Sequence, residues 1–317
     1  AASASAAGSR AGKARRSASP GKGRRSASPA RGAAANVDAA GLTYVVPDRV
    51  GCSLAQAEAL LRALARLHGQ WWGCAVGRGA HEGLGFLQGG RDGAERGYRP
   101  SPAVGMVLRR ALKKLPRLSA LWDALLRRLS AAPVTLLHGD CRPENLFFHC
   151  GGEPGWRVSF LDWEAVGINP AANDLAYFVT VGLRADDSAA WQPQLLHAYH
   201  RQLCLERAAV RELGQLGAPS SAAEAEADYP LSALQDDFLL LGCAMLVVQT
   251  CFALTDVFKG WGNNKKNLLP WMVRLCRYTQ RLDVARLCAL LTPGEAGGMT
   301  EAEARTILGE MQQKAGQ

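Results

Sequence analysis

The sequence predicts a mostly helical α+β fold with a small β hairpin at its centre. Several long segments carry apolar residues at helical spacing, and three short apolar runs bounded by turn residues are typical of strands. Hydrophobic residues make up 48% of the chain, which is enough for a buried core. With 317 residues, the chain can form one large domain or two modest ones.

The best-defined helix follows Ser53 and Gln56, which form a capping-box pattern, and continues to Trp72. Within it, we expect His68 to pack in the core. The apolar run 238–254 contains Gln249 and is shorter than the roughly 20 residues needed to cross a bilayer, so we expect a buried helix and no membrane span. The other expected helices are 103–115, 118–130, 174–183, 188–207, 231–258, 270–291 and 300–313, with a break at 224–228.

The expected strands place polar residues close to their ends. The strands are Val134–Leu137, Leu146–His149 and Arg157–Leu161. His138 and Asp140 follow the first strand, Asn145 precedes the second, and Asp162 follows the third. A turn-rich connection makes the second and third strands a hairpin.

This spacing has a chemical reason. Transfer of a phosphoryl group from a nucleotide needs a carboxylate to orient the attacking hydroxyl and oxygen ligands to hold Mg²⁺ on the phosphates. Asp140, an amide five residues later at Asn145, and Asp162 across the hairpin supply these groups. Together with His138 they match the H-x-D-x-x-x-x-N pattern, with a downstream Asp, of kinase-type catalytic loops.

The segments HGDCRPENLFF and FLDWEAVGINPAANDLAYFV resemble the large lobe of the aminoglycoside phosphotransferase and choline kinase superfamily, which has a protein-kinase-like fold. Among its branches, the sequence most resembles the ecdysteroid-kinase-like (CHK kinase-like) group and its bacterial relatives. The resemblance implies that Asp140 is the catalytic base and that His138, in the same catalytic loop, braces it. It also implies that Asn145 and Asp162 hold Mg²⁺ and ATP, and that Asp174 supports the loop from the next helix.

Some of these residues also fit roles outside phosphoryl transfer. Asp174 suits the cap of a helix equally well. A metal hydrolase site formed by His138, Asp140 and Asp162 is a weaker alternative, because Asn145 suits such a centre poorly. Cys141 and Arg142 stand where the family usually has a small hydrophobic residue or His, and Cys141 is expected to be an inert packing thiol.

The resemblance covers residues 42–295. We therefore expect a basic tail at 1–41, a kinase-like large lobe at 42–295 and a polar C-terminal helix at 296–317. Kinases of this superfamily also carry a small β-rich lobe with a Gly-rich turn and a strand Lys. The first 41 residues show no alternating strands, and the Gly-rich segment 73–102 lacks a nucleotide-loop pattern, so the small lobe is expected to be missing.

A missing small lobe can arise in two ways: from an incomplete gene model, or in a degenerate kinase that has lost its activity. The first is favoured because every residue of the catalytic-loop pattern is present. We therefore expect an ATP- and Mg²⁺-dependent phosphotransferase that acts on a hydroxyl of a small molecule. The alternative is a catalytically dead, kinase-like module that binds or regulates a partner.

The basic residues are concentrated in the tail. Residues 1–35 contain eight Lys or Arg and no acidic residue, which accounts for nearly all of the net charge of +9. The repeated RRSASPGKG and RRSASPARG cannot bury enough apolar surface to fold. Such a tail can be an organelle transit peptide, a weak anion-binding patch, a phosphorylation segment or a solvated extension, and no specific nucleic-acid partner is expected. Nine cysteines without a C-x-x-C pair favour a reducing, intracellular and cytoplasmic location.

Overall fold

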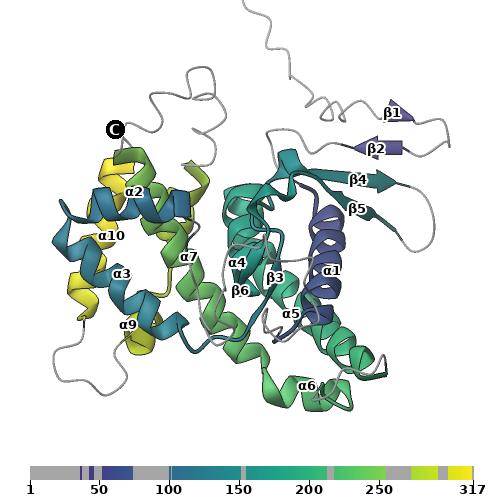
Figure 1. Cartoon of the computed structure of the whole chain (residues 1–317). Coiled ribbons are helices and arrows are strands. Elements are labelled where there is room, and N and C mark those ends of the chain that lie inside the picture. Colours follow the sequence, from purple (N-terminus) through teal and green to yellow (C-terminus); the bar gives the residue numbers. More distant parts are fainter. Residues whose placement is uncertain are drawn as a thin grey trace, which may run out of the picture. The chain divides into compact units, whose positions relative to one another are not determined.

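The computed structural model (Figure 1) describes part of the chain. The described residues are 36–37, 43–45, 52–73, 100, 102–150, 155–212, 218–254, 273–291 and 299–315. The basic tail 1–35 and nearly all of the Gly-rich segment 73–102 lie outside them, so the expectations for these two segments are not tested. Residues 33–317 form one compact unit, to which every element below belongs.

The described strands form two antiparallel sheets. The first has the order β1–β2–β4–β5, with β1 at Asn36–Val37, β2 at Thr43–Val45, β4 at Leu146–Cys150 and β5 at Arg157–Phe160. The β4–β5 hairpin confirms the predicted central hairpin. β2 was not among the expected strands, and its Tyr44 lies opposite His149 of β4.

The second sheet was only half predicted. It pairs β3, Val134–Leu137, with β6, Gly167–Pro170, so that Leu137 lies opposite Gly167. No sequence pattern indicates β6, because a four-residue strand that contains Gly and Pro has low β propensity. The loop between β3 and β4 therefore joins the two sheets, and it carries the candidate residues His138, Asp140 and Asn145.

Most predicted helices are present with shifted ends. α1 spans Leu54–Gln70 with Ser53 and Gln56 in a full capping box, and its apolar face is buried. α2 spans Pro102–Leu112, and α3 begins at Pro116 instead of after it, because Pro is favoured in the first turn of a helix. The remaining expected helices that are confirmed are α5, Ala185–Glu212; α7, Leu231–Leu254; and α10, Glu301–Ala315.

Two expectations for the helices were wrong. The segment 224–228 is not a break, since α6 spans Ala222–Asp228 and is capped by Ser221 Oγ, which accepts a hydrogen bond from Glu224 N. The single helix expected at 270–291 is interrupted: residues 273–279 are helical, a turn follows, and α9 begins at Val284. The helix expected at 174–183 is confirmed: α4 spans Ala172–Tyr177 and continues directly into a π-helical turn at Phe178–Gly182.

α7 is the central helix of the described core. It packs against α2, α3, α9 and α10 and also against α4 and α5 (Figure 1). Residues 231–252 are long and apolar enough to span a membrane by length and composition, but two thirds of the most apolar window (67%) is buried inside the fold. This confirms the predicted buried helix. α10 is amphipathic, because Ala304, Ile307 and Met311 on one face join the core.

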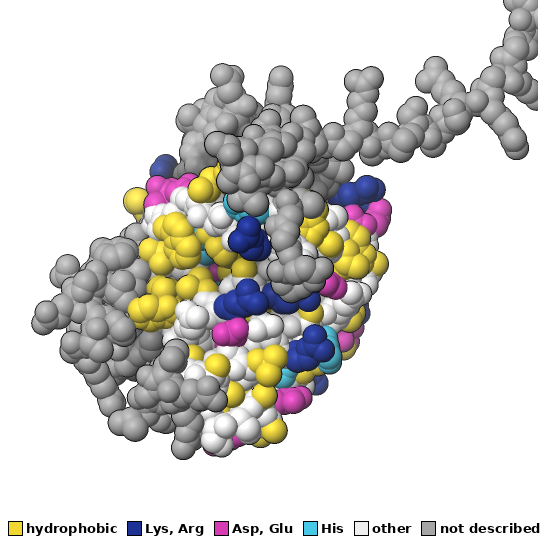
Figure 2. All heavy atoms as spheres, turned by 90° about the vertical axis from the view of Figure 1, so that its right-hand side faces the viewer, with side chains coloured by type: hydrophobic (Ala, Val, Ile, Leu, Met, Phe, Trp, Pro, Cys, Tyr) yellow, Lys and Arg dark blue, Asp and Glu magenta, His cyan; other side chains and the backbone are white. Residues whose placement is uncertain are grey.

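The surface in Figure 2 has a mixed character. On this face, Lys and Arg side chains are interspersed with acidic, His and hydrophobic side chains instead of gathering into one basic stripe.

Candidate active site

The loop that carries the candidate residues begins with a glycine that no other residue can replace without rearrangement. Gly139 has φ +84°, and a Cβ at this position would lie 2.1 Å from the carbonyl oxygen of Ala165. Without a side chain at Gly139, the loop after β3 can pass close to the backbone of Ala165 in the turn that follows Asp162. This turn, at Trp163–Ala165, is a short 3₁₀ helix.

Asp140 and Asn145 are in direct contact. The 3₁₀ turn Pro143–Asn145 brings the chain back, with the amide of Asn145 donating to the Arg142 carbonyl at 2.9 Å. Nδ2 of Asn145 then donates to Oδ2 of Asp140 at 2.8 Å and to the Asp140 carbonyl at 3.0 Å. The carboxamide oxygen of Asn145 remains the atom that can bind a hard cation.

Asp162 approaches the same place from the end of β5. The amide of Leu161 donates to the carbonyl of Asn145 at 2.8 Å, which fixes the start of the turn. Asp162 itself has φ 60° and ψ 68°, and it is the non-glycine residue with a positive φ within the described ranges. Backbone strain of this kind costs about 1–3 kcal/mol and is concentrated at functional sites.

Arg142 links the two carboxylates. Its Nε lies 3.3 Å from Oδ2 of Asp140, and its Nη2 lies 3.9 Å from Oδ2 of Asp162. The side chains of Asp140, Arg142 and Asp162 are 18%, 28% and 38% exposed, so solvent and a ligand can reach them. The structure thus gathers Asp140, Asn145 and Asp162 around one position.

His138 lies behind the loop, and both of its ring nitrogens are used. Nε2 donates to the carbonyl of Leu161 at 2.8 Å, and Nδ1 accepts from the amide of Asp140 at 3.3 Å. The side chain is completely buried. These contacts suit a brace between the two halves of the site and leave no ring nitrogen for a substrate or a metal.

Asp174 holds the loop from α4. Its carboxylate accepts hydrogen bonds from the amides of His138 and Gly139, each at 2.9 Å, and from Nε2 of His68 at 3.3 Å. The helix-cap interpretation was wrong, because the N-cap residue is Ala171 and the carboxylate points to the loop. Burial raises the pKa of Asp174, but the hydrogen bond and charge of His68, the charge of His138 and the Gly139 amide together lower it below its ordinary value.

Two residues of the site were missed from the sequence. Tyr177 is buried and hydrogen-bonded to Asp140. Burial is the main cause that raises the pKa of Tyr177 well above its ordinary value, followed by the charge of Asp140 and this hydrogen bond. The hydroxyl therefore stays protonated and remains a donor. His68, expected to be a packing residue, joins Asp174 to the hydroxyl of Tyr199, which lies 2.8 Å from Nδ1. The helical register could have indicated Tyr177, which lies three residues after Asp174 on α4.

Cys141 takes no part in the chemistry of this loop. Its side chain is fully buried. Burial, and then the charges of Asp174 and Asp140, raise the pKa of its thiol well above the ordinary value. A protonated, inaccessible thiol is unreactive, which supports the interpretation of Cys141 as an inert packing residue.

The donor set suits a hard cation. Mg²⁺ prefers carboxylate and amide oxygens and needs few protein ligands, which the pair Asn145 and Asp162 can supply. Over the described ranges no group of three or more His, Cys, Asp or Glu could hold a metal ion. The structure therefore does not favour the hydrolase alternative, whose third member, His138, is engaged elsewhere.

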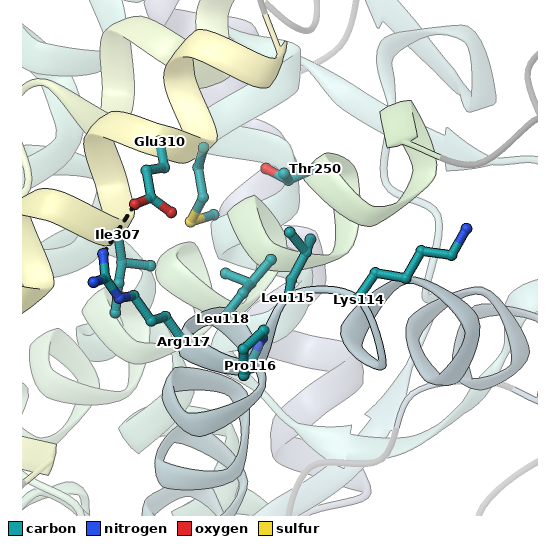
Figure 3. A pocket seen from close by; sticks show the side chains of 9 residues that line it. Lys114, Leu115, Pro116, Arg117, Leu118, Thr250, Ile307 and Glu310 are labelled. Atoms are coloured by element: carbon teal, nitrogen blue, oxygen red, sulfur yellow. Dashed lines mark hydrogen bonds and ion pairs between the residues drawn. The ribbon is translucent and has the colours of Figure 1, made fainter.

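A cavity of about 240 Å³ lies away from this site (Figure 3). Its walls come from the α2–α3 corner, from Thr250 of α7 and from α10, where Arg117 pairs with Glu310 at 3.2 Å. In Figure 3 the ammonium group of Lys114 extends away from the apolar side chains. The cavity shares no residue with the loop around Asp140 and has no carboxylate pair, so it is not a second arrangement for the same chemistry.

Comparison with known families agrees with the geometry of the loop. Residues 44–213 match the sequence profile of the phosphotransferase enzyme family, which is more than half of the chain. The chain belongs to this phosphotransferase family. The match includes all five predicted site residues and the two sheets from β2 to β6, whereas α6 to α10 lie beyond it. A search of curated proteins found none that matches the chain.

Membership in the phosphotransferase family confirms the broad resemblance to aminoglycoside phosphotransferases. The narrower assignment to the ecdysteroid-kinase-like branch stays a prediction. The individual roles of Asp140, His138, Asn145, Asp162 and Asp174 also stay predictions, now with a defined geometry.

Proposed function

We propose that the protein transfers the terminal phosphoryl group of ATP to a hydroxyl of a small molecule. Membership in the phosphotransferase family supports the reaction type. The observation that carries the proposal is that Asp140 and Asp162 both pair with the guanidinium of Arg142 at a partly exposed position, while Asn145 is bonded to Asp140. Kinase-type transfer needs these groups together, because it depends mainly on positioning and on electrostatic stabilisation.

Asp140 is the proposed base. Its carboxylate is held by Asn145 Nδ2 at 2.8 Å and by the hydroxyl of Tyr177. In the reaction, the substrate oxygen forms a bond to the terminal phosphorus, the bond between that phosphorus and the bridging oxygen breaks, and ADP leaves with the electron pair. The proton of the substrate hydroxyl passes to Asp140, so atoms and charge balance.

Asn145 and Asp162 are the proposed ligands of Mg²⁺. Their oxygens fit a hard cation, which, when bound, would neutralise the charge of the phosphates. The hydrogen bonds of its side chain to Asp140 position Asn145. Asp162 has a left-handed backbone conformation and directly follows Leu161, whose amide donates to the carbonyl of Asn145. His138 and Asp174 have supporting roles: they hold the backbone that carries Asp140.

The proposal is tested by replacing Asp140 with Asn in the protein expressed from the complete gene. We expect Asp140→Asn to reduce ATP-dependent phosphorylation by about 10²–10⁴-fold, the usual contribution of a general base. The assay incubates the protein with Mg²⁺, ATP labelled at the terminal phosphate and a small-molecule extract, and it measures label transferred to organic products. Binding of Mg²⁺ and ATP, measured by calorimetry, should remain within a few-fold.

Asp123→Asn is the matched control, because it removes an exposed carboxylate on α3, away from the loop. Its turnover should equal that of the wild type. Unchanged turnover in Asp140→Asn would refute the assignment of the base. Absence of any heat on mixing Mg²⁺ and ATP with the wild type would instead favour a binding or regulatory module.

A further inference from the structure

The position of Arg142 is unusual for a site proposed to bind a divalent cation. Its side chain already forms ion pairs with both carboxylates, at 3.3 Å to Asp140 and 3.9 Å to Asp162. The backbone of Arg142 is fixed in the loop, because its amide donates to the Asp140 carbonyl at 2.8 Å and its carbonyl accepts from the amide of Asn145. A positive charge is thus tethered inside the loop.

The charges of the site explain what this arrangement does. Two carboxylates that face one position repel each other, and the repulsion increases where solvent is partly excluded. The guanidinium offsets one of these charges and bridges the two halves of the site, the loop after β3 and the turn after β5. A divalent cation bound to Asp162 beside Asp140 would meet the same guanidinium at close range, and like charges there are unfavourable.

We propose that Arg142 is a tethered counter-ion that stabilises the carboxylates of Asp140 and Asp162 in the metal-free protein and competes with the divalent cation for them. The inference rests on the proposed function, because it takes Asp162 as a metal ligand, and it adds a control over metal entry. Arg142 acts as a positioning residue, not as a ligand or a base. It keeps the affinity for a free divalent cation low, so that the cation binds well only when additional negative charge accompanies it.

A purely structural role for Arg142 predicts the opposite result. If the side chain only stabilised the conformation of the loop, its loss would leave Asp140 and Asp162 less well positioned and would weaken metal binding. If it competes with the metal, its loss leaves two unbalanced carboxylates and strengthens metal binding. The sign of the change therefore separates the two roles.

The experiment measures Mn²⁺ binding without nucleotide, by the loss of the paramagnetic resonance signal of free Mn²⁺. We expect Arg142→Gln to bind Mn²⁺ about five- to tenfold more tightly than the wild type, a modest effect because the ion pairs are partly exposed. Arg142→Lys keeps the charge and should stay within about twofold of the wild type. Arg305→Met, which removes an equal charge from the exposed Arg305–Glu301 pair of α10, should cause no change.

Thermal unfolding of each variant is followed in parallel, and Arg142→Met replaces Arg142→Gln if the latter does not fold. Unchanged or weaker Mn²⁺ binding by a folded neutral variant would overturn the competition. Asp162→Asn distinguishes this failure from that of the proposed function. If Asp162→Asn binds Mn²⁺ as well as the wild type does, Asp162 is not a ligand and both proposals fall; if it binds less well, only the role of Arg142 is in question.

Discussion

Two buried carboxylates, Asp174 behind the catalytic loop and Asp237 on α7, respond to burial in opposite ways. Asp174 accepts hydrogen bonds from two backbone amides and from His68, and its pKa is lowered. Asp237 accepts a hydrogen bond from the hydroxyl of Tyr229 at 2.8 Å, and its pKa is raised to about 6, with burial as the main cause. Burial acts in the same direction on both, so the donors decide the outcome.

The comparison explains how the protein uses each group. An anchor for the loop that carries Asp140 has to remain an anion at every pH at which the protein works, and the donors around Asp174 ensure this. Asp237 lies beyond the part of the chain that matches the phosphotransferase family, at the junction of α6 and α7. Its ionisation near neutral pH costs stability and serves no contact of the proposed site.

The largest expected effect comes from removing the anchor itself. Asp174→Ala should lower the free energy of unfolding by about 3–5 kcal/mol, because it leaves the buried His68 and two loop amides without their acceptor. The measurement is urea denaturation at pH 7, followed by circular dichroism.

The control is Asp140→Asn, which removes a partly exposed carboxylate from the front of the same loop. It should change stability by less than about 1 kcal/mol. Equal losses in the two variants would break the distinction between an anchoring side and a reacting side of the loop.

A smaller effect is expected from removing one donor of the anchor. His68→Phe should cost about 2–3 kcal/mol at pH 7, because it breaks the buried hydrogen bonds to Asp174 and Tyr199. It should also bring the pKa of Asp174 back toward its ordinary value of 3.8. Because the pKa of Asp174 is lower in the folded state than in the unfolded state, its ionisation stabilises the fold above pH 3.8, the ordinary value. This stabilisation is lost as the pH falls through the pKa of the folded state. The stability difference between wild type and variant should therefore shrink below pH 3.8.

The measurement is urea denaturation at a series of pH values from neutral to acid. Tyr199→Phe is the matched control, since it removes the bond to Nδ1 and leaves the bond to Asp174. Its loss of stability should be independent of pH over this acid range. A pH-independent loss in His68→Phe as well would mean that His68 does not set the ionisation of Asp174.

The sequence predicted the parts of the site that depend on local spacing. His138, Asp140 and Asn145 lie within eight residues, and an apolar strand on either side marks where the loop begins and ends. The loop could therefore be recognised directly from the sequence. The hairpin of β4 and β5 was predictable for the same reason, and it brings Asp162 near the loop. The long amphipathic helices, such as α1 with its capping box at Ser53, were predicted because the apolar period and the cap agree.

What the sequence could not show depends on contacts between distant residues. His68 meets Asp174 across 106 positions, and nothing in the local pattern of α1 distinguishes this His from one that only packs. β6 is defined by its pairing with β3 and not by its own residues. The ion pairs of Arg142 with Asp140 and Asp162 also appear only after the hairpin has folded.

α6 is different, because Ser221 and Glu224 do form a capping pattern that precedes an Ala-rich run.

The smallest expected effect sharpens the comparison at the other carboxylate. Asp237→Asn should raise the free energy of unfolding by about 1–2 kcal/mol at pH 7, because the amide is neutral and its oxygen can still accept from Tyr229. The folded pKa of Asp237, about 6, is raised above its ordinary 3.8. The folded state thus has no penalty below pH 3.8, an increasing penalty up to about 6 and the full penalty above that value.

Urea denaturation of wild type and Asp237→Asn at a series of pH values from 3.8 to above 6 tests this sign directly. The gain should be absent at the acid end and largest at neutral pH, and Asp123→Asn, which removes an exposed carboxylate of α3, is the matched control. A loss of stability at neutral pH would mean that the Asp237 carboxylate is stabilised in the fold as Asp174 is. In that case the hydroxyl of Tyr229 and the charge of Arg128 outweigh burial, and the two carboxylates differ only in degree.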